Sequence, residues 1–574
     1  MDFFANRIDS ICRPGLNEPR PGISDGWPDS APRSVAGSSA GRRGKMIARS
    51  ESAARMYHNG TKHSFQSVRS DLHYLDFPNQ PMPFKVYGGI EPIPLPAEPP
   101  RATGNVFESI SSAGEGAGEN EPLSFEILAR IFFLTAGITK CIEAGGRSHY
   151  FRAAACTGAL YHIELYLICG DIPSGEGEGL PAGVYHLAAH DYAARPLRRG
   201  DFRASIAESL GRGEAPEAAF VFTSTYWRNS WKYRSRTYRH CFWDSGTMLA
   251  HFLAAVASYD LDVRLNAGFR DNEVNGLLGL DTRDEASLVV MELGERTPIQ
   301  AGAGELAPLE FETEPLSASH VDYPAIREIH GASSLGSGDE VLEWRSNAEK
   351  FLNENLRAGP ESGPESERSL GEKGFGKFPL AEGEPSGDSI DEVILRRGSA
   401  RRFERFPIPF EDLSLILRSA ARTVPADFLP GVRPALNEMF LIVNAVDGLP
   451  AGAYFFDRHR DTLVLLKEGD FRREAGVLGL EQELAADASV NVYFLCDLEK
   501  ILGAFGDRGY RAAQLEAGVM GGKLYLGAYA QRLAASGLTF FDDEVVSFFE
   551  PRAQGKEVMF LVLLGRRKSL KSRS

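Results

Sequence analysis

The sequence contains few cysteines and no long apolar run. Its six cysteines are scattered over 574 residues without a Cys-x-x-Cys pair, which fits neither a disulfide framework nor a zinc site. We therefore predict no metal centre. No stretch approaches the roughly 20 consecutive apolar residues of a membrane helix, and the N-terminus lacks the basic region and apolar core of a secretory signal. These absences predict a protein of the reducing cytoplasm.

Positive charge is also scarce. The chain has 63 basic and 78 acidic residues, a formal net charge of −15. Such a surface repels phosphate backbones and anionic lipids, so nucleic acids and membranes are poor partners for the whole molecule. A local basic pocket is still compatible with this charge. Hydrophobic residues make up 43% of the chain, which is enough for large cores and excludes disorder throughout.

Aliphatic side chains are sparse in residues 1–50, where Pro, Gly, Ser and Arg dominate. Such a segment cannot bury enough apolar surface to offset its chain entropy. We interpret it as a disordered leader. Met46 is an alternative start, because the interpretable sequence begins after it.

The most informative feature is an internal repeat. LPAGVYHL from Leu180 recurs as LPAGAYFF from Leu449, and GDFR from Gly200 recurs from Gly469, both 269 positions later. The pair Tyr238-Arg239 recurs 272 positions later. Matches in the same order at a nearly constant offset indicate two copies of one fold.

The repeat divides the chain into segments. The predicted organisation is a leader (1–50), an N-terminal extended segment (51–120), a first copy (121–296), a linker (297–387), a second copy (388–567) and a basic tail (568–574). The linker is rich in Gly, Pro, Ser and Glu and is predicted to be partly disordered, although residues 340–356 have helical periodicity compatible with docking.

Both copies show the same order of apolar segments. A helix is followed by strands, a long helix and a closing strand, and the long helices (240–259 and 512–536) are apolar nearly all round. Helices of that kind lie within a core. The pattern predicts an α+β fold in which a mixed sheet is covered by helices, with two such units forming an internal pseudo-dimer.

The second copy opens with a concentrated basic motif. ILRRGSARRF places Arg396, Arg397, Arg401 and Arg402 around Ser399. Guanidinium groups at this density form a fork-type site for a phosphate or carboxylate. A solvated basic edge before a helix is the alternative. The first copy has no such cluster before its first helix, which indicates that the copies have diverged.

Arg397-x-Ser399-x-Arg401-x-Phe403 resembles the opening motif of the nitroreductase-like flavoproteins. With the tandem arrangement and the segment 57–96, the chain is similar to SagB/ThcOx-type dehydrogenases. The resemblance implies two fused nitroreductase-like domains and an FMN-dependent oxidoreductase. It also implies that the flavin phosphate and ribityl chain are held by motif residues and by Arg566, which lies with Arg567 just after the last strand. The motif residues are Arg396, Arg397, Ser399 and Arg401. For Arg566, a basic C-terminal tail is an equal alternative.

A second family motif is matched by ACTGALYH at 155–162. In the family, this loop of one half approaches the flavin held by the other half. The resemblance therefore implies flavin contacts from Cys156, Thr157, Gly158, Ala159 and Leu160. Cys156 stands where the family has Ser and is a weaker donor, while Gly158 permits close approach of backbone amides or forms an ordinary turn. The second copy lacks this loop and the first lacks the arginines, so we expect one composite FMN site per chain.

Lys232-Tyr233 resembles the Lys-Tyr pair of SagB-type azoline dehydrogenases, which oxidise thiazoline or oxazoline rings of ribosomal peptides to azoles. Dehydrogenation removes a carbon-bound proton and a hydride, so a base must act beside the flavin. The resemblance makes Lys232 and Tyr233 the candidate catalytic residues. A lysine can act as a base only if burial or nearby cations lower its pKa, and we expect Arg228, Arg234 and Arg236 to supply these cations. An aromatic and basic surface segment is the alternative.

Three functions remain open at this stage. The first is an azoline dehydrogenase that acts on a modified peptide alongside peptide-cyclising partner enzymes. The second is a nitro or quinone reductase that acts on a small molecule and uses NAD(P)H. The third is a catalytically weak peptide-binding scaffold. The pseudo-dimer is intramolecular, and further oligomerisation stays open.

The leader yields a first prediction. Deletion of residues 2–50 is expected to leave the melting temperature and the flavin content unchanged, because this segment has almost no core-forming side chains. Differential scanning fluorimetry and flavin absorbance measure both quantities. A large loss of either would identify the leader as a docking segment.

Overall fold

The protein is described from a computed structural model. It describes residues 51–71, 73–112, 122–145, 147–175, 177–299, 306–358, 376–422, 424–430 and 434–568. The predicted leader, most of the basic tail and parts of the linker lie outside these residues.

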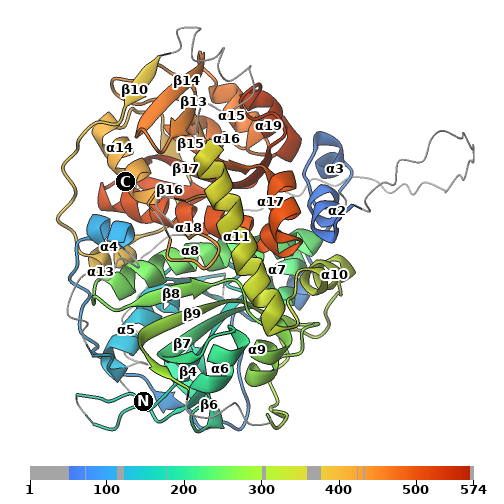
Figure 1. Ribbon diagram of the computed structural model, residues 1–574. Helices are drawn as coiled ribbons and strands as arrows, with labels where there is room; N and C mark the ends of the chain where they lie inside the picture. The colour runs from blue at the N-terminus through green and yellow to red at the C-terminus, as the bar shows by residue number, and fades with distance from the viewer. Residues whose placement is uncertain are drawn as a thin grey trace, which may run out of the picture.

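The first copy contains a seven-stranded sheet (Figure 1). Its strands follow the order β1 (Ile93–Pro94), β6 (Ala193–Arg199), β5 (Gly183–Ala188), β4 (Ile163–Cys169), β7 (Glu214–Thr225), β9 (Glu285–Pro298) and β8 (Val263–Asn266). Every residue of β4 and β5 is buried, as expected for strands covered on both faces. A separate hairpin pairs β2 (Ile138–Ala144) with β3 (Arg147–Arg152).

The second copy contains an eight-stranded sheet with the same core order. Its strands are β10 (Lys377–Pro379), β14 (Thr462–Glu468), β13 (Gly452–Asp457), β12 (Glu438–Val443), β15 (Val490–Cys496), β17 (Glu557–Arg567) and β11 (Phe403–Glu404), with β16 (Ala534–Gly537) also on β17. Both sheets are covered by helices, which confirms the α+β class. The expected mixed sheet needs correction, because every strand pair formed by the described residues is antiparallel.

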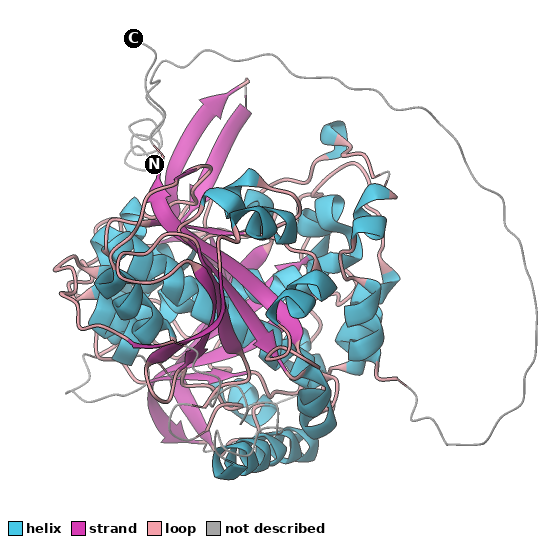
Figure 2. Cartoon of the chain, turned by 90° about the horizontal axis from the view of Figure 1, so that it is seen from above, coloured by secondary structure: helices cyan, strands magenta, loops and turns pink. Residues whose placement is uncertain are grey.

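Helices surround and separate the sheets (Figure 2). Up to the end of the first copy they are α2 (Ala53–Gly60), α3 (Phe65–Arg69), η1 (Phe77–Asn79), α4 (Val106–Ser112), α5 (Phe125–Ala136), η2 (Thr157–Ala159), α6 (Arg203–Ser209), α7 (Tyr226–Tyr233), η3 (Arg234–Arg236), α8 (Thr237–Ala257) and α9 (Asp271–Leu278). The later ones are α10 (Pro324–Ala332), α11 (Gly338–Ala358), α13 (Ile390–Arg396), α14 (Phe410–Ala420), α15 (Arg472–Leu478), α16 (Glu483–Asp487), α17 (Leu498–Phe505), α18 (Arg508–Ala530) and α19 (Asp542–Phe549). None of the described helices combines the length and apolarity needed to cross a membrane.

One boundary differs from the sequence prediction. The apolar segment 512–536 was expected to be a single helix, but α18 ends at Ala530. Arg532 has a φ of 57°, which turns the chain out of the helix, and the following residues pair with β17 as β16. The last apolar residues of the segment therefore form a strand of the sheet instead of continuing the helix.

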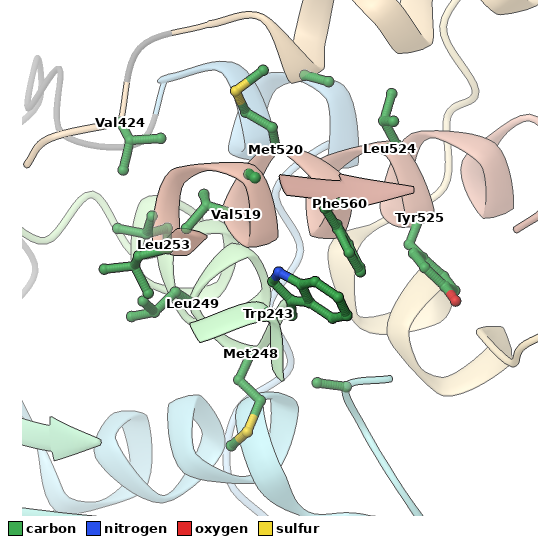
Figure 3. Close-up of a cluster of buried hydrophobic side chains, with 14 of the residues drawn as sticks. Trp243, Met248, Leu249, Leu253, Val424, Val519, Met520, Leu524, Tyr525 and Phe560 are labelled. Carbon is green, nitrogen blue, oxygen red and sulfur yellow. The ribbon is translucent and has the colours of Figure 1, made fainter. Parts of the chain in front are cut away.

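The long helices α8 and α18 cross between the two sheets (Figure 1). Gly246 and Gly518, which are 272 positions apart, meet at the crossing. A Cβ on Gly246 would lie 2.6 Å from the Gly518 carbonyl carbon, and a Cβ on Gly518 would lie 2.7 Å from the Phe242 oxygen. The two backbones can approach this closely because neither residue has a side chain. Around the crossing, apolar side chains of both helices pack together, and Trp243 of α8 also contacts Phe560 of β17 (Figure 3).

Two buried ion-pair clusters flank this crossing. At the start of α18, Arg508 and Arg511 bind the Asp271 carboxylate of α9 at 2.6 and 2.7 Å. At the start of α8, Arg236 and Arg239 bind Asp542 of α19. These two arginines precede Arg508 and Arg511 by 272 positions, and Asp542 follows Asp271 by 271. Burial alone would raise the pKa of Asp271, but the two arginines outweigh it and lower that pKa to about 2. Each copy thus supplies two arginines to one carboxylate of the other copy.

The crossing glycines yield a stability prediction. Gly518→Ala is expected to destabilise the protein by about 1–3 kcal/mol, because the added methyl group forces the α8 backbone away. Gly503→Ala in α17 is the matched control, since nothing lies within 4 Å of its Cβ position. That control should be neutral or stabilising by up to about 1 kcal/mol, the ordinary helix preference for Ala. Urea unfolding of both variants measures the difference, and equal effects would contradict the close crossing.

Candidate functional site

The loop at 155–162 has a backbone that few residues other than glycine favour. Gly158, Ala159 and Tyr161 have φ angles of 66°, 54° and 45°. A Cβ on Gly158 would lie 2.8 Å from the Tyr233 hydroxyl oxygen. Backbone strain of this kind is concentrated at functional sites. The structure therefore brings the predicted flavin loop against the predicted catalytic tyrosine.

A buried carboxylate that the sequence analysis did not identify anchors this loop. Asp244, on α8, accepts hydrogen bonds from the Thr157 amide at 2.9 Å, the Thr157 hydroxyl at 2.8 Å and the Cys156 thiol at 3.1 Å. The Oδ2 atom of Asp244 also lies 2.9 Å from His162 Nε2. Burial and then Asp244 raise the pKa of Cys156 well above its ordinary value, so the group is a thiol at neutral pH. Cys156 and Thr157 thus both shape the loop through Asp244.

Leu160 of the loop faces an aromatic cluster. Leu160 packs with Trp227 and Trp231 of α7, and Tyr233 lies against the same cluster. The N-terminal segment completes this side, because Trp231 Nε1 donates to the Asp76 carbonyl at 3.1 Å. Leu160 therefore fixes the loop to α7.

Arg397 joins the two copies at the site. Its Nε donates to the Ala153 carbonyl at 2.7 Å and its Nη2 to the Arg152 carbonyl at 2.9 Å. Burial lowers the pKa of Arg397. The first arginine of the motif therefore holds the start of the flavin loop.

The remaining motif donors face outward. Ser399 and Arg401 are exposed, and Ser399 Oγ lies 3.5 Å from the Tyr525 hydroxyl of α18. Arg401 makes no ion pair with any acidic residue in the described part of the chain. A hydroxyl and an unpaired guanidinium suit an anionic ligand.

The two outer arginines have other partners. Arg396 binds Asp388 at 2.6 Å and the Tyr529 carbonyl at 2.8 Å. Arg566 lies 4.8 Å from the centre of the Phe406 ring. Its neighbour Arg567 lies nearer the motif. Burial raises the pKa of Tyr529, and the charges of Arg397 and Arg567 both oppose that rise, so the two arginines act on the same tyrosine. Alternation along β17 thus places Arg567 nearer the motif.

The candidate catalytic pair lies where the two copies meet. Lys232 Nζ is 5.2 Å from the centre of the Tyr233 ring, and that ring stands at 88° to His240 with 4.7 Å between centroids. Partial burial and then Arg401 lower the pKa of Lys232. Burial and then Asp244 raise the pKa of Tyr233. The first-copy pair and the second-copy motif are therefore close enough to interact electrostatically.

The cations that act on Lys232 differ from the predicted ones. Each predicted arginine has its own carboxylate partner: Arg228 with Glu164, Arg234 with Asp71 and Arg236 with Asp542. These pairs neutralise charges that sequence proximity alone assigned to the lysine. Arg401, distant in sequence, takes that role because the pseudo-dimer brings it there.

The symmetry-related position is filled by the linker. Phe505, 272 positions after Tyr233, packs on Trp344 and Phe351 of α11 at ring-centroid distances of 6.1 and 5.1 Å. A Cβ on Gly268 would lie 2.8 Å from Trp344, and Arg345 Nη2 donates to the Gly268 carbonyl at 2.8 Å. Figure 1 shows α11 running along both copies. The linker helix therefore packs on Phe505, the residue that corresponds to Tyr233 of the composite site.

The composite site fits the FMN that the resemblance implies. Arg401 and Arg567 are exposed cations and Ser399 adds a hydroxyl, which suits a phosphate. Gly158 allows a planar ring to approach the loop backbone. The ligand atoms of Cys156, His162 and Asp244 lie within 4.8 Å of one another, a spacing that a cation could also use; the absence of a metal centre stays a prediction.

Sequence analysis missed Asp244 and the residues on which α11 packs. A usable signal for Asp244 was the acidic residue Glu516 at the corresponding position of the second long helix. Nothing in the local sequence indicates that Trp344 packs against Gly268 and Phe505, because these residues lie far away in the chain.

Comparisons with known proteins found relatives of part of the chain. No protein-family model matches the chain. The chain is 26% identical over 165 residues to a protein of Methanocaldococcus jannaschii named as a nitroreductase, MJ1384, covering 27% of this chain and 81% of that protein. It is 29% identical over 143 residues to the microcin B17-processing protein McbC of Escherichia coli, covering 24% of this chain and about half, 52%, of McbC.

A solved structure extends the likeness to both copies. A protein of Anabaena variabilis, also named as a nitroreductase, superposes with a TM-score of 0.69 over 90% of this chain and 100% of its own, at 23% identity. At that identity the likeness concerns the fold. The chain therefore has a nitroreductase-like fold that spans both sheets.

Proposed function

We propose that the protein is an FMN-dependent oxidoreductase of the nitroreductase type with one composite site per chain. One observation carries the proposal: Arg397 of the second-copy motif donates to the Arg152 and Ala153 carbonyls at the start of the first-copy loop, whose Gly158 lies against the Tyr233 hydroxyl. Similarity to MJ1384 and McbC supports the same activity. The packing of α11 on Phe505, the counterpart of Tyr233, supports a single flavin.

The residues suggest how a proton and a hydride are separated. Bound FMN supplies the hydride acceptor. Lys232 accepts the substrate proton, because partial burial and Arg401 lower its pKa and so increase the fraction of free amine. Tyr233 stays protonated and orients the substrate as a hydrogen-bond donor, because burial and Asp244 raise its pKa.

The substrate that we propose is an azoline ring in a modified peptide. The Lys232-Tyr233 pair supports it, as does the similarity to McbC, whose name describes processing of microcin B17. Removing a carbon-bound proton needs a base, which this pair supplies. Peptide-cyclising enzymes would be the partners that form the azoline.

Reduction of a nitro compound or quinone with NAD(P)H is the second candidate. The name of MJ1384 favours it, and the same flavin pocket would serve. Hydride delivery from a nicotinamide needs no carbon-proton base, so the two candidates differ in their dependence on Lys232.

Flavin retention tests the composite site. Arg401→Ala is expected to weaken FMN binding by about 10- to 100-fold, the value of one charge-assisted hydrogen bond. Arg405→Ala is the matched control, because that exposed arginine pairs with Asp487. Apoprotein titrated with FMN and followed by flavin fluorescence gives both affinities and the stoichiometry. Two flavins per chain, or equal affinities in the two variants, would contradict the model.

Variants of the catalytic pair separate the two reactions. Lys232→Ala and Tyr233→Phe should both keep the flavin spectrum. Lys232→Ala should slow flavin reduction by a thiazoline peptide about 10²- to 10⁴-fold, the usual cost of losing a general base, and Tyr233→Phe should slow it through loss of the orienting hydrogen bond. Anaerobic stopped-flow mixing with the peptide, and separately with NADPH, measures the rates. Unchanged peptide-driven reduction in Lys232→Ala would remove the pair from the mechanism. Fast NADPH reduction in wild type and variant alike would favour the second candidate.

A further inference from the structure

Asp244 stands at the centre of the flavin loop's hydrogen bonds. It is 4% exposed and accepts bonds from the backbone and side chain of Thr157 and from the thiol of Cys156. His162 closes the group, since its Nε2 contacts Asp244 and its Nδ1 lies 2.8 Å from Ser224 Oγ on β7. The carboxylate therefore joins both ends of the loop to α8.

The second copy uses the same device. Glu516, 272 positions later on α18, accepts bonds from the Leu436 amide at 2.9 Å and from the amide and side chain of Asn437 at 2.8 and 2.7 Å. Burial raises the pKa of Glu516. Both long helices thus hold the preceding loop with a buried acid, although only the first-copy loop faces the composite site.

We propose that Asp244 is the positioning residue of the composite site and that its carboxylate sets the loop backbone that receives the flavin. The inference rests on the proposed FMN function. The geometry gives its consequence, because Gly158 lies against the Tyr233 hydroxyl. Releasing the loop from Asp244 would move the Gly158 backbone relative to the Tyr233 hydroxyl.

Three variants test the proposal. Asp244→Asn keeps the side-chain size but turns one acceptor into a donor that faces the Cys156 thiol and His162. Asp244→Glu restores the charge in the form that the second copy uses. Glu516→Gln is the matched control, since it removes the same kind of anchor from the loop that lies away from the site.

Two measurements are made on the full chain. Hydrogen exchange followed by mass spectrometry should show faster exchange of residues 156–162 in Asp244→Asn and of residues 434–438 in Glu516→Gln. The FMN dissociation constant should rise about 10- to 100-fold in Asp244→Asn only, and the visible circular dichroism of the bound flavin should change only there. Asp244→Glu should recover at least part of the FMN affinity. If the two buried acids had a purely structural role, Asp244→Asn and Glu516→Gln would weaken FMN binding to the same extent.

The outcomes are distinguishable. Equal FMN affinity in Asp244→Asn and Glu516→Gln overturns the inference, and so does unchanged exchange of the first-copy loop in Asp244→Asn. One equivalent of tightly bound metal in wild type, lost in Asp244→Asn by elemental analysis, also overturns it, because the carboxylate would then be a ligand. Failure of wild type to bind FMN overturns the proposed function, while the exchange experiment still tests the anchor.

Discussion

The close crossing of α8 and α18 is the contact on which the rest of the structure depends. Gly246 and Gly518 bring the two backbones together, and the arginines that begin each helix reach a carboxylate of the opposite copy. Charges buried this deeply need a partner, since an isolated one would carry a large desolvation cost. The glycines fix the distance between the copies, and the reciprocal ion pairs fix their orientation.

That symmetric frame supports an asymmetric function. One corresponding position combines the Gly158 loop, the Lys232-Tyr233 pair and the Arg401 motif, whereas the other is filled by Trp344 and its neighbours on α11. The linker is therefore part of the core at this place. A fold with two similar halves has two corresponding positions for a site. Here the position around Phe505 packs against α11 instead.

The charge pattern around Lys232 illustrates how the fold assigns roles. Arginines next to Lys232 in sequence are neutralised by carboxylates from other elements. Together with partial burial, Arg401, which forms no ion pair within the described residues, lowers the pKa of Lys232 from the second copy. Electrostatic influence falls with distance in space, so neighbours along the chain are poor guides once each has a buried partner.

Much of the architecture was already determined by the sequence alone. The repeat offsets, the apolar segments and the two long helices predicted an α+β pseudo-dimer, because periodicity and composition act locally. Only the tertiary structure decided that Asp244 anchors the loop, that Arg397 binds the Arg152 and Ala153 carbonyls, and that α11 fills the second position. These contacts join residues far apart in the chain, and their energies depend on burial and distance, which no local pattern encodes.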